Sequence, residues 1–160
     1  MLQVKNLFVD LGGFRLTADF EIERGSLISI VGPSGAGKST ILNALAGFIP
    51  LTSGVIKWNG SDITKLDPGL RPLSILFQDY NLFSHLTVKD NIAIGLRPNL
   101  KLDDLETEMV NSVIEEVGLS KFKFIKPFQL SGGQRTRVSL ARSIVRSKPI
   151  LLLDEAFSGL

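Results

Sequence analysis

Cysteine is absent from the 160 residues of the chain, and histidine, tryptophan and tyrosine occur once each. Without cysteine, the chain has no disulfide, no thiolate nucleophile and no cysteine-built zinc site. No apolar run approaches the ~18 residues of a membrane-spanning helix, and residues 1–7 lack the cationic and apolar segments of a signal peptide. If the protein works at a membrane, we expect another chain to cross it.

The chain also lacks a strong charge imbalance. Eighteen basic residues against 16 acidic ones give a formal charge of +2, and the Lys and Arg positions are dispersed. This distribution disfavours nucleic acid as a partner. Hydrophobic residues make up 44% and charged residues 21%, an ordinary globular composition that argues against disordered, collagenous and coiled-coil classes. The length fits one domain that buries roughly 70% of its unfolded surface.

Short apolar segments predict the strands of an α/β fold. Residues 4–9 and 15–22 alternate in polarity around Gly12 and Gly13, which predicts an antiparallel hairpin. The run from Leu27 to Val31 is mostly apolar and ends at a glycine, as a buried parallel strand does. Further strands are predicted at 55–58, 73–77 and 150–153.

Helical spacing follows the glycine loop at 39–47 and returns after Asn81. Asp103 and Glu106 are placed to cap a helix that ends near Gly118. One face of this helix is predicted to carry Leu102, Leu105, Met109, Val110, Val113, Ile114 and Val117. A second helical region is predicted over 130–146, so a helical insertion interrupts the α/β core.

A glycine-rich loop lies between the predicted strand at 27–31 and the predicted helix at 39–47. Glycines at 35 and 37 allow backbone N–H groups to surround phosphate oxygens without a Cβ in the way. Lys38 is expected to contact the β- and γ-phosphates, and Ser39 to offer its hydroxyl to Mg²⁺. The predicted ATP-binding residues of this loop are Gly32, Pro33, Ser34, Gly35, Ala36, Gly37, Lys38, Ser39 and Thr40.

Two carboxylates end the last predicted strand. Asp154 follows the apolar run Ile150–Leu153, which places it at the carboxyl edge of a parallel sheet, where such folds bind ligands. It is a candidate Mg²⁺ ligand, and Glu155 is a candidate to orient or deprotonate an attacking water. Taken alone, such a pair is more often a helix N-cap or a solvated strand end.

A second anion site is predicted at residues 130–134. Ser131 precedes a periodic helix, so it reads as an N-cap with exposed amides beside it. One nucleotide does not need both half-sites from one protomer. A head-to-tail dimer is therefore expected, in which Ser131 and Gly133 contact the phosphate held by Lys38 of the other copy. The alternative interpretation is an ordinary Gly-Gly helix boundary.

In this order the motifs resemble the ATP-binding subunits of ABC transporters, with Gly32–Thr40 as Walker A, Leu130–Gln134 as the signature and Ile150–Glu155 as Walker B. The resemblance covers the chain and implies binding of ATP and Mg²⁺ and ATP hydrolysis. It implies catalytic roles for Lys38, Gln78 and Glu155, and Mg²⁺ ligation by Ser39, Gln78 and Asp154. It also implies nucleotide contacts from Ser131, Gly132, Gly133 and Gln134.

The segments 76–88 and 91–96 resemble the thiamine importers of this family. That resemblance implies a bacterial complex of two such subunits, a membrane permease and a periplasmic binding protein, at the cytoplasmic face of the inner membrane. Importers of iron, sulfate or polyamines share most of the motifs and remain alternatives. His85 precedes the signature, so a surface or permease-facing role is expected instead of that of the family's switch histidine.

The family resemblance implies a P-loop α/β core with an N-terminal antiparallel subdomain and a helical subdomain. Residues 1–80 then form the β subdomain and first part of the core, 81–138 the helical subdomain, and 139–160 the return to the core. The chain resembles the N-terminal portion of a longer subunit, whose D-loop aspartate and switch histidine come later. We therefore expect these 160 residues to hydrolyse ATP slowly or not at all.

The sequence departs from the family pattern at one position of the first hairpin, and it argues against two other classes of protein. Leu11 occupies the position where an aromatic residue commonly stacks on adenine, which leaves Phe8 or Phe14 as substitutes. A DNA-acting ABC ATPase would place a long coiled coil between Ser39 and Leu130, and too few residues intervene. A monomeric P-loop kinase or GTPase would lack the signature.

Overall fold

The structure, a computed structural model, describes residues 1–77 and 81–154. The chain divides into two compact units, Met1–Pro72 and Leu73–Leu160, and each is described by itself. In the described ranges no helix is long and apolar enough to cross a membrane.

The first unit is built on an antiparallel sheet of order β2-β1-β3-β4. Its strands are β1 (Leu2–Asp10), β2 (Arg15–Ile22), β3 (Ser53–Trp58) and β4 (Ser61–Asp62). The β1–β2 pairing confirms the hairpin predicted around Gly12 and Gly13. A register shift between Val4 and Leu7 moves the alternation by one residue, so Leu7 and Val9 are buried like Leu2 and Val4.

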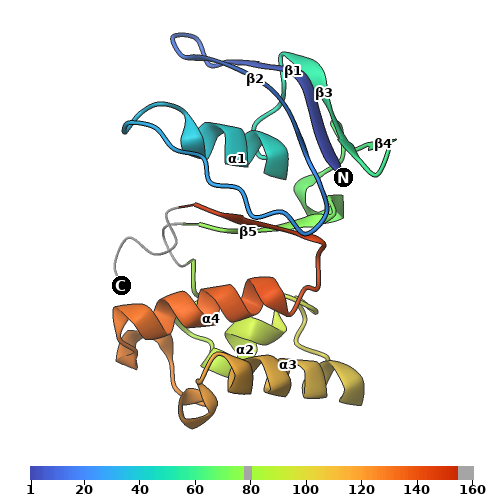
Figure 1. Ribbon diagram of the computed structural model, residues 1–160. Helices are drawn as coiled ribbons and strands as arrows, with labels where there is room; N and C mark the ends of the chain where they lie inside the picture. The colour runs from blue at the N-terminus through green and yellow to red at the C-terminus, as the bar shows by residue number, and fades with distance from the viewer. Residues whose placement is uncertain (78–80, 155–160) are drawn as a thin grey trace. The chain divides into compact units, whose positions relative to one another are not determined.

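Helix α1 (Lys38–Ala46) lies along one face of this sheet (Figure 1). Among its buried residues, Ile41, Ala44 and Leu45 follow the helical period that the sequence predicts, and Ala46 is buried at the end of the helix. A short 3₁₀ helix, η1 (Pro68–Leu70), closes the unit.

The strand predicted from Leu27 to Val31 does not form. In the structure these residues are irregular, and Leu27 and Val31 are 95% and 91% exposed. A strand buried in a parallel sheet needs hydrogen-bonded neighbours. Among the described residues every strand pairs elsewhere, so the apolar run finds no partner. The prediction is therefore wrong for this structure, although the glycine loop and helix that follow it are present.

The second unit pairs β5 (Leu73–Leu76) in parallel with β6 (Ile150–Leu153), as the sequence predicts. Helices α2 (Val88–Ala93), α3 (Asp104–Glu116) and α4 (Gly132–Ile144) lie on one side of this pair (Figure 1). Two 3₁₀ turns, η2 (Ser120–Phe122) and η3 (Pro127–Gln129), connect α3 to α4. A buried cluster between the helices contains Val88, Ile92, Ala93, Val110, Ile114, Leu119, Leu130, Val138, Ala141 and Val145.

The sequence predicts the N-terminal cap of α3 correctly, but it makes the apolar face of this helix too wide. Asp103 and Glu106 form the predicted capping box, with the Glu106 N–H donating to Asp103 Oδ1 at 2.8 Å. The predicted apolar face is too wide, because Leu105 and Met109 are 73% and 40% exposed. Val110 and Ile114 are buried in the cluster, and Leu102, Val113 and Val117 pack against it, so the rest of the predicted face is confirmed.

Candidate nucleotide-binding site

The glycine loop adopts left-handed backbone angles at the two positions where the sequence predicts that glycine is needed. Gly35 has φ +78° and Gly37, the N-cap of α1, has φ +94°. Residues with a side chain rarely adopt these backbone angles, so glycine is needed at both positions for the loop to follow this path. The Ile41 N–H donates to the Gly37 carbonyl at 2.9 Å, which continues the helix directly from the loop.

The Lys38 side chain folds back over its own loop. Its ammonium donates to the carbonyls of Gly32 and Pro33, each at 3.0 Å. An ammonium held there, at the positive end of a helix, suits an anionic ligand. The exposed Ser39 hydroxyl follows in the first turn of α1. These observations fit the phosphate groups and the Mg²⁺ ion predicted for this loop.

The aromatic ring of Phe14 lies against the same loop. A Cβ added to Gly37 would stand 2.6 Å from Phe14 Cζ and 3.3 Å from a Leu16 methyl carbon. No side chain fits at Gly37 while the first hairpin packs here. Of the two aromatic candidates, Phe14 is the one placed beside the phosphate loop, whereas Phe8 lines a shallow pocket with Thr17 and Asp19.

The second predicted half-site begins α4. Ser131 is its N-cap, and its hydroxyl accepts the Gln134 N–H at 3.3 Å. Gln134 Oε1 in turn accepts the Ser131 N–H at 2.8 Å, which completes a capping box. The Gln134 side chain is therefore engaged with its own helix end. Gly132 and Gly133 form the first turn, where helical N–H groups have no intrahelical acceptor.

Asp154 stands at the carboxyl edge of the β5–β6 pair. Its N–H donates to the Leu76 carbonyl at 3.0 Å, and Asp154 is 9% exposed. Ser39 belongs to the first unit and Asp154 to the second. Gln78 and Glu155 lie outside the described residues, so their catalytic and Mg²⁺-binding roles stay predictions.

Comparison with known proteins agrees with this set of motifs. A family model described as ABC transporter matches residues 17–158. The chain belongs to the ABC transporter family. This membership confirms the predicted α/β fold of an ABC ATPase and assigns the chain to enzymes that couple ATP hydrolysis to transport.

Several curated ABC relatives are named thiamine import ATP-binding protein ThiQ. That of Histophilus somni is 52% identical over 160 residues, which are 100% of this chain and 74% of the relative. That of Ruegeria sp. is 47% identical over 160 residues, which are 69% of its length. That of Escherichia coli O157:H7 is 52% identical over 139 residues, 87% of this chain and 60% of the relative. The chain thus spans between 60% and 74% of these relatives.

A solved ABC structure supports the fold independently. It is described as the dimeric, post-hydrolysis state of the ATP-binding cassette MJ0796 bound to ADP and Pi. It matches with a TM-score of 0.84 and 29% identity, over 100% of this chain and 76% of that one.

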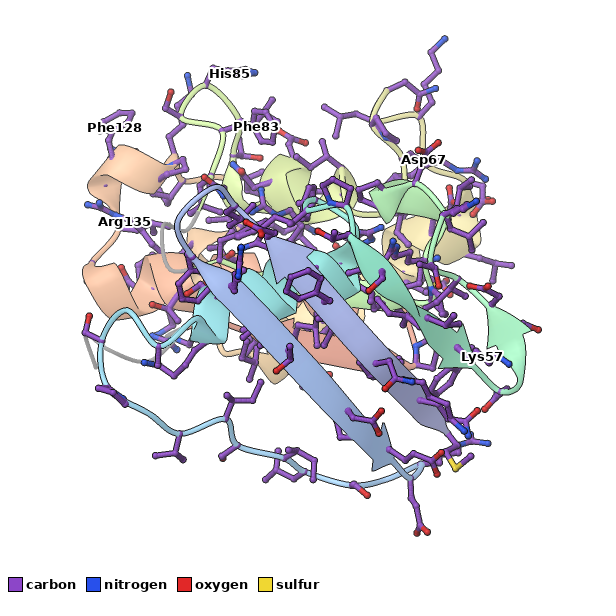
Figure 2. The ribbon with its side chains drawn as sticks, turned by 90° about the horizontal axis from the view of Figure 1, so that it is seen from above. Lys57, Asp67, Phe83, His85, Phe128 and Arg135 are labelled. Atoms are coloured by element: carbon purple, nitrogen blue, oxygen red, sulfur yellow. The ribbon has the colours of Figure 1, made fainter. Side chains whose placement is uncertain are left out.

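In this ABC chain, the loop before α2 presents the lone histidine to solvent. His85 is exposed, and its ring meets the Phe83 ring edge-on at 6.0 Å between centroids (Figure 2). Buried Asn91 organises the loop: its Oδ1 accepts the Phe83 N–H, and its Nδ2 donates to three loop carbonyls. The exposed position agrees with the predicted surface role of His85.

Sequence reasoning assigns no function to Arg71 or Asn91. Arg71 is 3% exposed, and burial lowers the pKa of its guanidinium. Neither residue belongs to a recognisable sequence motif: Arg71 precedes an apolar strand, and Asn91 lies on a helix. Only the fold shows that each satisfies several backbone groups at once. Tertiary contacts of this kind leave no periodic signal in the sequence.

Proposed function

We propose that the chain is the ATP-binding and ATP-hydrolysing subunit of a bacterial importer for thiamine or its phosphate esters. The observation that carries the ATP site is the Lys38 ammonium, held over the glycine loop by the Gly32 and Pro33 carbonyls. The substrate assignment is supported by whole-chain similarity to thiamine import ATP-binding proteins.

Each residue has a proposed role in phosphoryl transfer that follows from its charge and position. The loop N–H groups and Lys38 bind the β- and γ-phosphates, and the positive end of α1 faces the anion. Ser39, Asp154 and Gln78 are proposed to hold Mg²⁺, which neutralises developing charge on the phosphates. Glu155 is proposed to orient the attacking water, with Ser131 and Gly133 of a second copy contacting the γ-phosphate.

The proposed partners are a second copy of this chain, a membrane permease and, through the permease, a periplasmic binding protein. Dimer formation is supported by the dimeric state of the related cassette. The proposed location is the cytoplasmic face of the bacterial inner membrane, which follows from the thiamine import role of the relatives.

Calorimetric titration with Mg-ATP tests the nucleotide site. We expect saturable binding by the unsubstituted protein and its loss in Lys38→Ala, because the ammonium is the cation aimed at the phosphates. Lys57→Ala, on β3, is the matched control that removes a lysine outside the loop. Binding that survives in Lys38→Ala would contradict the proposed site.

Uptake of labelled substrate tests the transport assignment. Introducing the gene into a bacterium that lacks its own thiamine import ATPase is expected to restore thiamine uptake. The same gene carrying Lys38→Ala is expected not to restore it. Iron, sulfate and polyamine uptake, measured in matching deletion strains, are the alternative outcomes. Restoration of one of these without thiamine would reassign the substrate and leave the ATPase role intact.

A further inference from the structure

Arg71 places a buried cation at the C-terminal end of the phosphate-loop helix. Its Nη1 group donates to the carbonyls of Ala44 and Leu45, at 3.0 and 2.6 Å. Both carbonyls belong to the last turn of α1, where C=O groups lack the i+4 N–H donor of the helix interior. The Ala44 carbonyl also accepts the N–H of the C-cap Gly47 at 3.1 Å. In the described parts of the chain no carboxylate forms a salt bridge with this guanidinium. The charge is therefore directed at the helix end.

The other side of the guanidinium reaches the loop after β4. Nε donates to the Leu66 carbonyl at 3.0 Å and Nη2 to the Thr64 carbonyl at 2.7 Å. The Thr64 hydroxyl accepts the Ile56 N–H at 2.8 Å, and this bond connects the loop to β3. One side chain thus joins the end of α1 to the sheet of the same unit.

Gly47 makes room for this arrangement. It is the C-cap of α1, with φ +87°, and an added Cβ would stand 2.6 Å from Arg71 Nε and 2.8 Å from Cζ. A larger residue would displace the guanidinium from the helix end. The left-handed angle and the close approach require glycine for two separate reasons.

The consequence for the phosphate loop follows from the shortness of α1. Its nine residues span about 13 Å, and so short a helix depends on tertiary contacts for its order. Lys38 and Ser39 stand at one end and Arg71 binds the other. A tilt of roughly 5° about the Arg71 end would move the Lys38 end by about 1 Å, a displacement large enough to weaken a phosphate site markedly.

We propose that Arg71 is a positioning residue for phosphate binding, which fixes the axis of α1 and so the places of Lys38 and Ser39. The proposal rests on the proposed ATP-binding function. The guanidinium also opposes the negative end of the helix dipole, so its charge and its geometry act in the same direction.

The test compares Arg71→Met, which removes charge and donors at similar length, with Arg71→Lys, which keeps a cationic donor. Mg-ATP affinity is measured by calorimetry in the purified protein, well below its unfolding transition. We expect the Kd to rise by about tenfold in Arg71→Met, the low end of the effects seen when residues that orient the side chains binding a metal are substituted. Arg71→Lys should restore most of the affinity.

Two further measurements separate positioning from general loss of stability. Val9→Ala removes buried methyl groups from β1 but no hydrogen bond to α1. It should lower the urea midpoint and leave the Kd unchanged. In the nucleotide-free protein, the amide signals of Gly37 and Lys38 should shift in Arg71→Met, while those of Gly132 and Gly133 stay in place.

The outcomes are distinct. If Arg71→Met is less stable but binds Mg-ATP with the original Kd, or if Val9→Ala loses affinity equally, Arg71 has a structural role only and the proposal is wrong. If the unsubstituted protein itself does not bind Mg-ATP, the proposed function fails instead.

Discussion

At the scale of single residues, the surroundings of Phe8 and Phe14 decide which ring is available to a nucleotide base. Only Phe14 contacts the glycine loop, through Gly37. We expect Phe14→Ala to weaken Mg-ATP binding by about 1–3 kcal/mol, the range for base–aromatic stacking, and Phe8→Ala to leave it unchanged. Inorganic triphosphate, which has no base, is the control ligand in the same titration. Equal weakening of ATP and triphosphate would show that Phe14 acts on the loop and not on the base.

The Asp62 carboxyl is expected to make the stability of the first unit depend on pH. Hydrogen bonds from the side chain and backbone of Thr64 hold the pKa of the Asp62 carboxyl below its ordinary value. A lowered pKa in the folded state stabilises the protein above the ordinary pKa, and this contribution disappears as pH falls through the folded value.

The corresponding measurement is urea unfolding of the unsubstituted protein and of Asp62→Asn between pH 7 and pH 2. The stability difference between the two should be constant at neutral pH and shrink below about pH 5, where an ordinary aspartate begins to protonate. A difference that grows on acidification would contradict the assignment. Because the carboxylate is exposed, the effect should be small.

At the scale of elements, two capping boxes offer a matched comparison. Asp103→Ala and Ser131→Ala each remove an N-cap acceptor, so each should lower the free energy of unfolding by about 1 kcal/mol. Only Ser131 belongs to the proposed nucleotide site. The slow ATPase rate expected of the chain should therefore fall further in Ser131→Ala and stay unchanged in Asp103→Ala. Equal activities in the two variants would leave Ser131 as a cap alone.

The same elements show what the sequence could predict. The Asp103–Glu106 capping box, the Ser131 N-cap, the Gly12–Gly13 hairpin and the glycine loop are local patterns, and the structure confirms each of them. The strand at Leu27–Val31 fails because a strand is defined by a partner, and pairing is not a local property. The bonds of Arg71 to α1 escape detection for a related reason, since their partners lie 26 and 27 residues away.

At the scale of the whole molecule, the motifs present two proposed half-sites for one nucleotide. Lys38 lies over a glycine loop in the first unit, and Ser131 caps α4 in the second. A related cassette is dimeric with ADP and Pi bound. If two copies combine head to tail, each composite site takes Lys38 from one copy and Ser131 from the other.

Mixing two inactive variants tests this arrangement. Lys38→Ala removes the phosphate-binding cation, and Ser131→Asp keeps an N-cap acceptor while placing a negative charge against the γ-phosphate. In a head-to-tail heterodimer of the two, one site contains both substitutions and the other contains neither. The slow ATPase activity expected of the unsubstituted chain should therefore reappear on mixing, in proportion to the amount of heterodimer measured by tagged co-purification. If both half-sites act within one copy, every site in the mixture carries a defect, and the activity would stay at the level of the separate variants.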